Sequence, residues 1–211
     1  MISKLLAAGA VALALSQAGV AQASIVSDGD FTQGASAGSF TTIGGGQAIG
    51  PWTVTGNSVD LIGSYWQATP NGGYTVDLDG NGAGGISQAL SLSQGTYQVS
   101  FYLGGNPDGG PATKDLTVSV DGVSVPFSFT NAGQTHGNMG YELETFDFTV
   151  LTPTTTSTAL SFTSTDAPGN PWGPVVGQVA VSVVPEPGSL ALLLAGLGLV
   201  GTVARRRSRF F

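Results

Sequence analysis

The sequence of 211 residues contains no cysteine and one histidine, and only 9% of its residues are charged. The absence of cysteine excludes disulfide scaffolds, thiolate zinc sites, iron–sulfur clusters and a thiol nucleophile. A single histidine, His136, excludes any site that needs two of them. The hydrophobic content of 41% and the aromatic content of 9% are sufficient for a packed core, which argues against a disordered chain.

Basic residues are almost absent from the middle of the chain. Between residues 24 and 184, twelve acidic residues stand against one basic residue, Lys114, which gives a net charge of −11. Without cationic groups on its surface, this region is not expected to bind nucleic acid or anionic lipid. Neutral glycans, divalent cations and basic partners remain compatible with the charge.

Residues 1–23 have the features of a signal peptide. Lys4 provides the positive charge, residues 5–15 form a short apolar stretch, and Ala21-Gln22-Ala23 is an A-x-A cleavage site that leaves Ser24 as the first mature residue. We therefore expect export through the Sec translocon and cleavage by signal peptidase. An uncleaved anchor is the alternative, although the apolar stretch is short for crossing a bilayer.

The other end of the chain has the pattern of a membrane-spanning tail. Residues 188–204 carry no charge, are rich in leucine and glycine, and reach about the lower length limit for a transmembrane helix. A basic cluster follows at 205–209, made of Arg205, Arg206, Arg207 and Arg209. By the positive-inside rule, this cluster stays cytoplasmic and the bulk of the protein lies outside. The alternative is a tail helix packed against the folded domain in water.

Residues 185–211 resemble the PEP-CTERM sorting signal, because Pro185-Glu186-Pro187 precedes the apolar stretch and the arginine cluster. The resemblance implies a substrate of an exosortase, a membrane protease-transpeptidase of Gram-negative bacteria. It implies export through the inner membrane, a membrane-anchored precursor, and a cut near the tripeptide. The product would be released or attached at the cell surface, in a bacterium that makes an exopolysaccharide or biofilm matrix.

Residues 24–184 alternate between apolar and polar side chains with a period of two, which predicts half-buried antiparallel strands. Asp121-Gly122 predicts a two-residue hairpin turn, and Pro126 predicts that its strand lies at a sheet edge or is bulged there. With glycine-rich turns between the strands, this predicts an all-β sandwich or jelly roll. Alternating runs occur at 97–103, 116–120, 123–129, 146–150, 160–163 and 179–183, and further strands are expected at 50–55, 58–63, 73–79 and 85–92.

The same region resembles the choice-of-anchor C family, which is related to plant cell-wall domains of unknown function and to galactose-binding-like jelly rolls. The motifs that carry the resemblance are Ser27-Asp28-Gly29-Asp30-Phe31, Pro51-Trp52-Thr53-Val54-Thr55-Gly56, Ser58-Val59-Asp60-Leu61-Ile62-Gly63 and Gly104-Gly105-Asn106-Pro107-Asp108-Gly109. Many such jelly rolls bind carbohydrate and hold a structural calcium between their first and last strands. Thr32 and Gly177-Gln178 stand where that family carries carboxylates, so two expected calcium ligands are missing.

A second candidate for calcium is the run Asp77-Leu78-Asp79-Gly80-Asn81, which nearly matches an EF-hand loop. Asp77, Asp79 and Asn81 would offer three oxygen side chains at alternate positions. The twelfth position holds Gln88 in place of the bidentate glutamate, and the flanks indicate strands. The alternative is a strand end that runs into a β-turn, and we expect no cofactor apart from this calcium.

Three aromatic residues are candidates for a carbohydrate platform: Tyr65, Trp66 and Trp172. They lie in glycine- and proline-containing loops, where exposed rings can stack on sugar faces. The alternative for Trp66 and Trp172 is that they cover the core. Trp52, at a strand start, is expected in the core.

No catalytic site is expected. His136 lies in a polar loop without a recognisable nucleophile, and it is expected to be exposed. Glu142 and Glu144 share one strand face, whereas glycosidase carboxylates normally face each other across a cleft. The sequence therefore favours a non-catalytic module that binds carbohydrate or exopolysaccharide. A structural surface protein without a ligand is the alternative, and a glycoside hydrolase is a further one.

Overall fold

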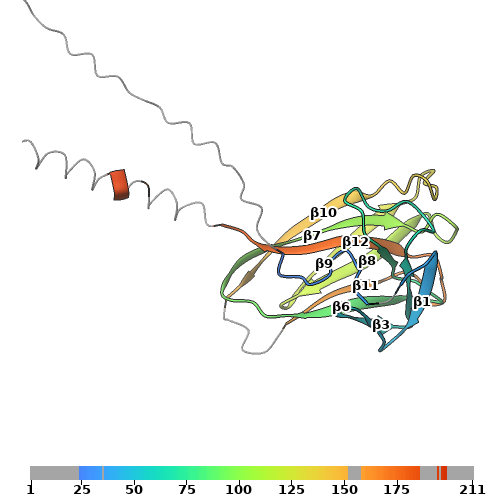
Figure 1. Ribbon diagram of the computed structural model, residues 1–211, viewed down its shortest axis with the longest axis horizontal. Helices are drawn as coiled ribbons and strands as arrows, with labels where there is room; N and C mark the ends of the chain where they lie inside the picture. Colours follow the sequence, from blue (N-terminus) through green and yellow to red (C-terminus); the bar gives the residue numbers. More distant parts are fainter. Residues whose placement is uncertain (1–23, 35, 152–157, 186–193, 195, 199–211) are drawn as a thin grey trace, which may run out of the picture.

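The computed structural model describes residues 24–34, 36–151, 158–185, 194 and 196–198, and those between 24 and 185 form a sandwich of two β-sheets (Figure 1). Each sheet has six strands, in the orders β1-β4-β5-β12-β7-β10 and β2-β3-β6-β11-β8-β9. Every strand pair is antiparallel. The strands are β1 (Phe40–Gly44), β2 (Ala48–Ile49), β3 (Trp52–Gly56), β4 (Ser58–Ile62), β5 (Thr75–Asp77), β6 (Gly84–Leu90), β7 (Gly95–Gly105), β8 (Thr113–Val120), β9 (Val123–Thr130), β10 (Glu142–Val150), β11 (Thr158–Ser164) and β12 (Pro174–Val183).

The core lies between the two sheets and is formed by the apolar side of each alternating strand. Trp52 is fully buried, as expected, and its ring contacts those of Phe31 and Phe162 at centroid distances of 5.5 and 6.2 Å. Its indole nitrogen donates a hydrogen bond to the carbonyl of Asp28. Phe101 packs edge-on against Phe162 from the opposite sheet. Aromatic rings from both sheets thus interlock across the layer, which fixes how the sheets stack.

Two local predictions from turn chemistry are confirmed. Asp121 and Gly122 both have positive φ, at 47° and 78°, and Val120 pairs with Val123 across the two-residue turn. This combination matches the twist of the flanking strands β8 and β9. Pro126, which cannot donate a backbone hydrogen bond, lies in β9 at the edge of its sheet.

The N-terminal segment completes the sheet beside β12. Strand β5 pairs only with residues 175–176 of β12, and beyond that point the backbone of Ile25 and Gly29 bonds to β12 instead. A Cβ on Gly29 would lie 1.9 Å from the carbonyl oxygen of Val179, so the close approach requires glycine. Strand β12 bulges between Gly177 and Ala180 at this point.

The sequence did not predict β1 or β2, and it placed the last strand at 179–183 although β12 begins at Pro174. The signal-peptide residues Ala21 and Ala23, the tail residues Glu186 and Pro187, and the cluster Arg205, Arg206, Arg207 and Arg209 lie outside the described residues. Of the expected tail helix at 188–204, only Leu194 and residues 196–198 are described, and these are helical. Within the described ranges, no helix has the length and apolar character needed to cross a membrane. The tail helix stays a prediction.

Candidate functional site

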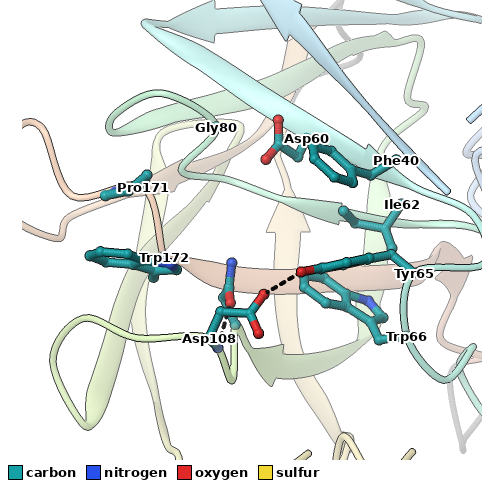
Figure 2. Close-up of a pocket in the computed structure, with 10 residues that line it drawn as sticks. Phe40, Asp60, Ile62, Tyr65, Trp66, Gly80, Asp108, Pro171 and Trp172 are labelled. Atoms are coloured by element: carbon teal, nitrogen blue, oxygen red, sulfur yellow. Dashed lines mark hydrogen bonds between the residues drawn. The ribbon is translucent and has the colours of Figure 1, made fainter. Parts of the chain in front are cut away.

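One end of the sandwich carries a cleft of about 170 Å³ that is lined mainly by aromatic and acidic side chains. Figure 2 shows Asp60 and Asp108 on opposite sides of this cleft, with Trp172 toward one end and Tyr65 toward the other. We call it the aromatic cleft. Its lining residues are Phe40, Asp60, Ile62, Tyr65, Trp66, Gly80, Asn106, Asp108, Pro171 and Trp172.

The loop after β4 builds one wall of the cleft. Trp66 folds back against the outer face of the sheet and packs in a small cluster with Ile62, Met139 and Val175. It is only 6% exposed, and its indole nitrogen donates a hydrogen bond of 3.0 Å to the hydroxyl of Thr75. Trp66 therefore both covers the sheet and contributes to the cleft lining, so the two alternatives from the sequence are not exclusive.

Tyr65 continues this wall toward solvent. Its ring lies 5.6 Å from that of Trp66 and 5.2 Å from that of Phe40, measured between centroids. Phe40, the first residue of β1, is 47% exposed, although a side chain of this size is usually covered. Three rings from two elements thus form a continuous apolar surface at the mouth of the cleft.

Asp108 is held in place by two side chains. The hydroxyl of Tyr65 donates to its Oδ2 at 3.0 Å, and Nε2 of His136 lies 2.6 Å from its Oδ1. The imidazole also packs against the Tyr65 ring, with 4.6 Å between centroids. The hydrogen bond to the carboxylate raises the pKa of Tyr65. His136 is half-buried, although the sequence predicted an exposed loop residue, and it contacts a cleft residue that sequence reasoning did not connect with it.

Trp172 and Pro171 form the opposite wall, in the loop between β11 and β12. Trp172 is 38% exposed and packs on Gly109, where an added Cβ would lie 3.1 Å from the indole ring. The ammonium group of Lys114 donates to the carbonyls of Gly109 and Trp172 at 2.7 and 2.6 Å. This buried lysine therefore ties together the two loops that carry Asp108 and Trp172.

Two carboxylates lie beneath the cleft. Asp77 and Asp79 are both fully buried, whereas Asn81 is exposed. Asp77 accepts hydrogen bonds from the backbone of Asp79 and Gly173 and from Nδ2 of Asn106. Burial raises the pKa of Asp77 well above its ordinary value and raises that of Asp79 to about 6.

The EF-hand-like run thus forms the end of β5 and the turn after it, with strands on either side. Among the described residues, no group of three or more histidine, cysteine, aspartate or glutamate side chains has the arrangement of a metal site. Asn81, whose backbone donates to Ser58, is exposed and separate from the two buried carboxylates. Calcium at this run stays a prediction.

The calcium position that the family resemblance implies is also incomplete. Asp28 accepts backbone hydrogen bonds from Thr32 and Gln33 through Oδ1, and its buried Oδ2 has no partner in the structure. Across from it, Gln178 uses its side-chain amide to donate to the carbonyl of Gly72. Calcium takes six to eight oxygen ligands, among them carboxylates and backbone carbonyls, and calcium at this position stays a prediction.

The three aromatic residues singled out in the sequence, Tyr65, Trp66 and Trp172, meet in the aromatic cleft although they come from different loops. Sequence reasoning did not assign Phe40, Asp60 or Asp108 to the site. Asp60 and Asp108 belong to the motifs that carry the family resemblance, which was the available signal. Glu142, Glu144 and Asp147, considered for hydrolysis, do not line the cleft.

Fold and site together define a β-sandwich of jelly-roll type that carries an aromatic cleft at one end. The sandwich itself is confirmed as the sequence predicted it. The chain belongs to the family described as protein of unknown function (DUF642), whose model matches residues 24–182. A PEP-CTERM protein-sorting motif matches residues 183–208, so the expected sorting signal is confirmed. This motif indicates a secreted protein that an exosortase processes. The name choice-of-anchor C stays a prediction.

Similarity to individual proteins is more limited. A curated relative, Halomucin of Haloquadratum walsbyi, is 31% identical over an alignment of 121 residues, which covers 54% of this chain and 1% of that protein. An arabinose-bound α-L-arabinofuranosidase has a TM-score of 0.52 at 11% identity, over 75% of this chain and 26% of the enzyme. A family 61 carbohydrate-binding module in complex with β-1,4-galactotriose has a TM-score of 0.45 at 13% identity, over 77% of this chain and all of the module. At these identities the structures share the fold alone.

Proposed function

We propose that the protein is an exported carbohydrate-binding module without catalytic activity, and that the aromatic cleft holds the sugar. The observation that carries this proposal is the convergence of Phe40, Tyr65, Trp66 and Trp172 with polar groups in one cleft. Aromatic rings offer apolar faces to the C–H groups of a pyranose, while carboxylates and amides accept and donate hydrogen bonds at its hydroxyls. Asp60, Asn106 and Asp108 provide such polar groups.

The proposal includes the route that the sequence suggests. Residues 1–23 direct the chain to the Sec translocon and are removed by signal peptidase. The tail at 188–204 anchors the precursor in the inner membrane of a Gram-negative bacterium, with Arg205–Arg209 on the cytoplasmic side. The exosortase then cuts near Pro185, and the domain works at the cell surface or in an extracellular polysaccharide matrix.

The absence of catalysis is supported by how the acidic residues are arranged. Both carboxylate oxygens of Asp108 have partners, Tyr65 and His136, which suits a positioned hydrogen-bonding group more than a nucleophile. On β10, Glu144 pairs with Phe101 on the side facing the other sheet, whereas Asp147 points to the opposite side. These carboxylates do not converge on a cleft.

A structural surface protein without a ligand is a second candidate, favoured by the burial of Trp66. The exposure of Trp172 and Phe40 favours binding. A glycan array and a pull-down with extracellular polysaccharides distinguish the two functions. Both use the full chain in mild detergent, and the polysaccharides include the polymer of the host itself. Retention by a glycan is expected, and a complete lack of retention would leave the structural role.

The cleft is tested with Trp172→Ala, which removes a wall of the binding surface and should weaken binding about tenfold or more. Leu143→Ala is the matched control, because Leu143 is 59% exposed and lies outside the cleft. Equal losses in both variants would contradict a site at this place. The export route is tested by intact mass of cell-associated and released protein, where removal of both termini is expected.

A further inference from the structure

The charged residues that line the aromatic cleft are all acidic. They are Asp60 and Asp108, on opposite sides of the cleft (Figure 2). Asp60 accepts a hydrogen bond from the hydroxyl of Thr42, and no hydrogen bond to its second oxygen is seen among the described residues. The partners of Asp108 are a phenol and an imidazole. Within the part of the chain that the structure describes, no lysine or arginine lines the cleft to balance these carboxylates.

The one basic residue between residues 24 and 184 is already engaged. Lys114 is fully buried, and its ammonium group donates to two backbone carbonyls beneath the cleft. Burial lowers the pKa of Lys114, while the neighbouring carboxyl groups of Asp166, Asp77 and Asp79 act in the opposite direction. Asp77 on β5 lies directly opposite Asp60 on the neighbouring strand β4. Lys114 is therefore engaged beneath the cleft and is not among the residues that line it.

The rings at the mouth favour a positive charge as well. Phe40 and Trp172 are 47% and 38% exposed, and Tyr65 lies between Phe40 and His136. The face of an aromatic ring attracts a cation within about 6 Å of its centroid, and the attraction increases where water is excluded. Carboxylates on two sides and rings at the ends form a receptor for an ammonium group attached to a compact, partly apolar body.

We propose that the aromatic cleft selects a sugar that carries a protonated amine, such as a hexosamine residue with a free amino group. The inference rests on the proposed carbohydrate binding and adds the charge of the ligand. An amine can bond to Asp60 while the ring faces of the sugar contact Phe40, Tyr65 or Trp172. An N-acetylated or neutral sugar keeps the stacking and loses the charge interaction. A uronic acid is repelled by both carboxylates.

The test uses four methyl glycosides: the glucosaminide, which is positively charged, the N-acetylglucosaminide and the glucoside, which are neutral, and the glucuronide, which is negatively charged. Each is also used in the galacto configuration. Dissociation constants are measured by ligand-observed NMR with the full chain in mild detergent, at a pH of about 6.5, where an amine of this kind is mostly protonated. We expect one amino glycoside to bind about tenfold more tightly than its neutral and N-acetylated counterparts. The glucuronide or galacturonide should bind most weakly.

Asp60→Asn is the diagnostic variant, because it keeps the shape and removes one charge. It should reduce the ratio of affinities for the amino and the neutral glycoside about fivefold or more. Asp121→Asn is the control, because it also removes one negative charge while Asp121 lies in the β8–β9 turn, outside the cleft lining. Thermal melting of both variants establishes that they remain folded.

The outcomes separate this inference from the proposed function. If a neutral glycoside binds as tightly as the amino glycoside, the preference for an amine is wrong and carbohydrate binding stands. If no glycoside binds, carbohydrate binding fails together with the inference. If lysine methyl ester binds as tightly as the amino glycoside, the cleft recognises a cation alone and the sugar has no part in it.

Discussion

Raising the pH from 4 to 7 should destabilise this domain, and Asp79 should be a major cause. Its side chain is fully buried, and burial raises its pKa from 3.8 to about 6. A carboxyl group with a higher pKa in the folded state holds its proton more tightly when folded, so folding is favoured while the proton is bound. Ionisation between these two values therefore lowers the free energy of unfolding, by at most about 3 kcal/mol for Asp79.

The other shifted carboxyl groups act in the same direction. Burial raises the pKa of Asp77, Asp28, Asp60 and Asp166. For each of them, the stabilising contribution is complete below the pKa of the unfolded chain and disappears as the pH rises through the folded-state value. Proteins whose carboxylates form ion pairs show the opposite trend and lose stability in acid.

Urea unfolding at a series of pH values between 4 and 7.5 measures this effect. The free energy of unfolding of the unmodified chain should fall across the series, and Asp79→Asn should remove a large part of the fall. Asp121→Asn, a change in the half-buried β8–β9 turn, should leave the profile unchanged. A free energy that rises with pH, or the same profile with and without Asp79, would refute the assignment of a raised pKa to this buried group.

Three further changes test the packing, the turn and the buried lysine. Trp52→Ala should cost about 3–5 kcal/mol in urea unfolding, because it removes a fully buried ring at the centre of the core, and a loss below about 1 kcal/mol would contradict that packing. Gly122→Ala should reduce the stability by about 1 kcal/mol in a thermal-shift assay, since a φ of 78° is strained for other residues. Gly137→Ala should be neutral in the same assay, because a Cβ at Gly137 would meet no other atom within 4 Å. Lys114→Met should cost about 3 kcal/mol, because two carbonyls lose their donor and the buried carboxylates lose their cation, and an unchanged urea midpoint would show that the ammonium group is dispensable.

The fold could be predicted because its strands alternate cleanly. In β7, residues 97–103 alternate between buried apolar and partly exposed side chains, and in β8 every second residue is buried and all of these except Lys114 are apolar, so period and burial coincide. Strand β1 was missed because its burial pattern has three exposed residues followed by a buried one, and β2 because it has only two residues. Such short edge strands are defined by their pairing partners, which a local pattern does not contain.

The cleft could be predicted only in part. Loop aromatics can be recognised in a sequence, and Tyr65, Trp66 and Trp172 were found in this way. The position of Asp108 depends on its partners Tyr65 and His136, which lie 43 and 28 residues away in the chain. A contact of this kind is set by which loops the topology brings to one end of the sandwich, so no spacing rule reveals it.

The two ends of the domain lie beside each other, far from the cleft. Val181 donates its backbone N–H to the hydroxyl of Ser24, and Val184 donates to the carbonyl of Thr96 at the start of β7, so Ser24 and Val184 lie at the same end of the sandwich (Figure 1). Asn106 follows the last residue of the same strand, roughly 35 Å away for its 11 residues. A chain held at its C-terminal end would thus have its cleft on the side facing away from the attachment point. Long polymers could reach the cleft while the chain is still attached.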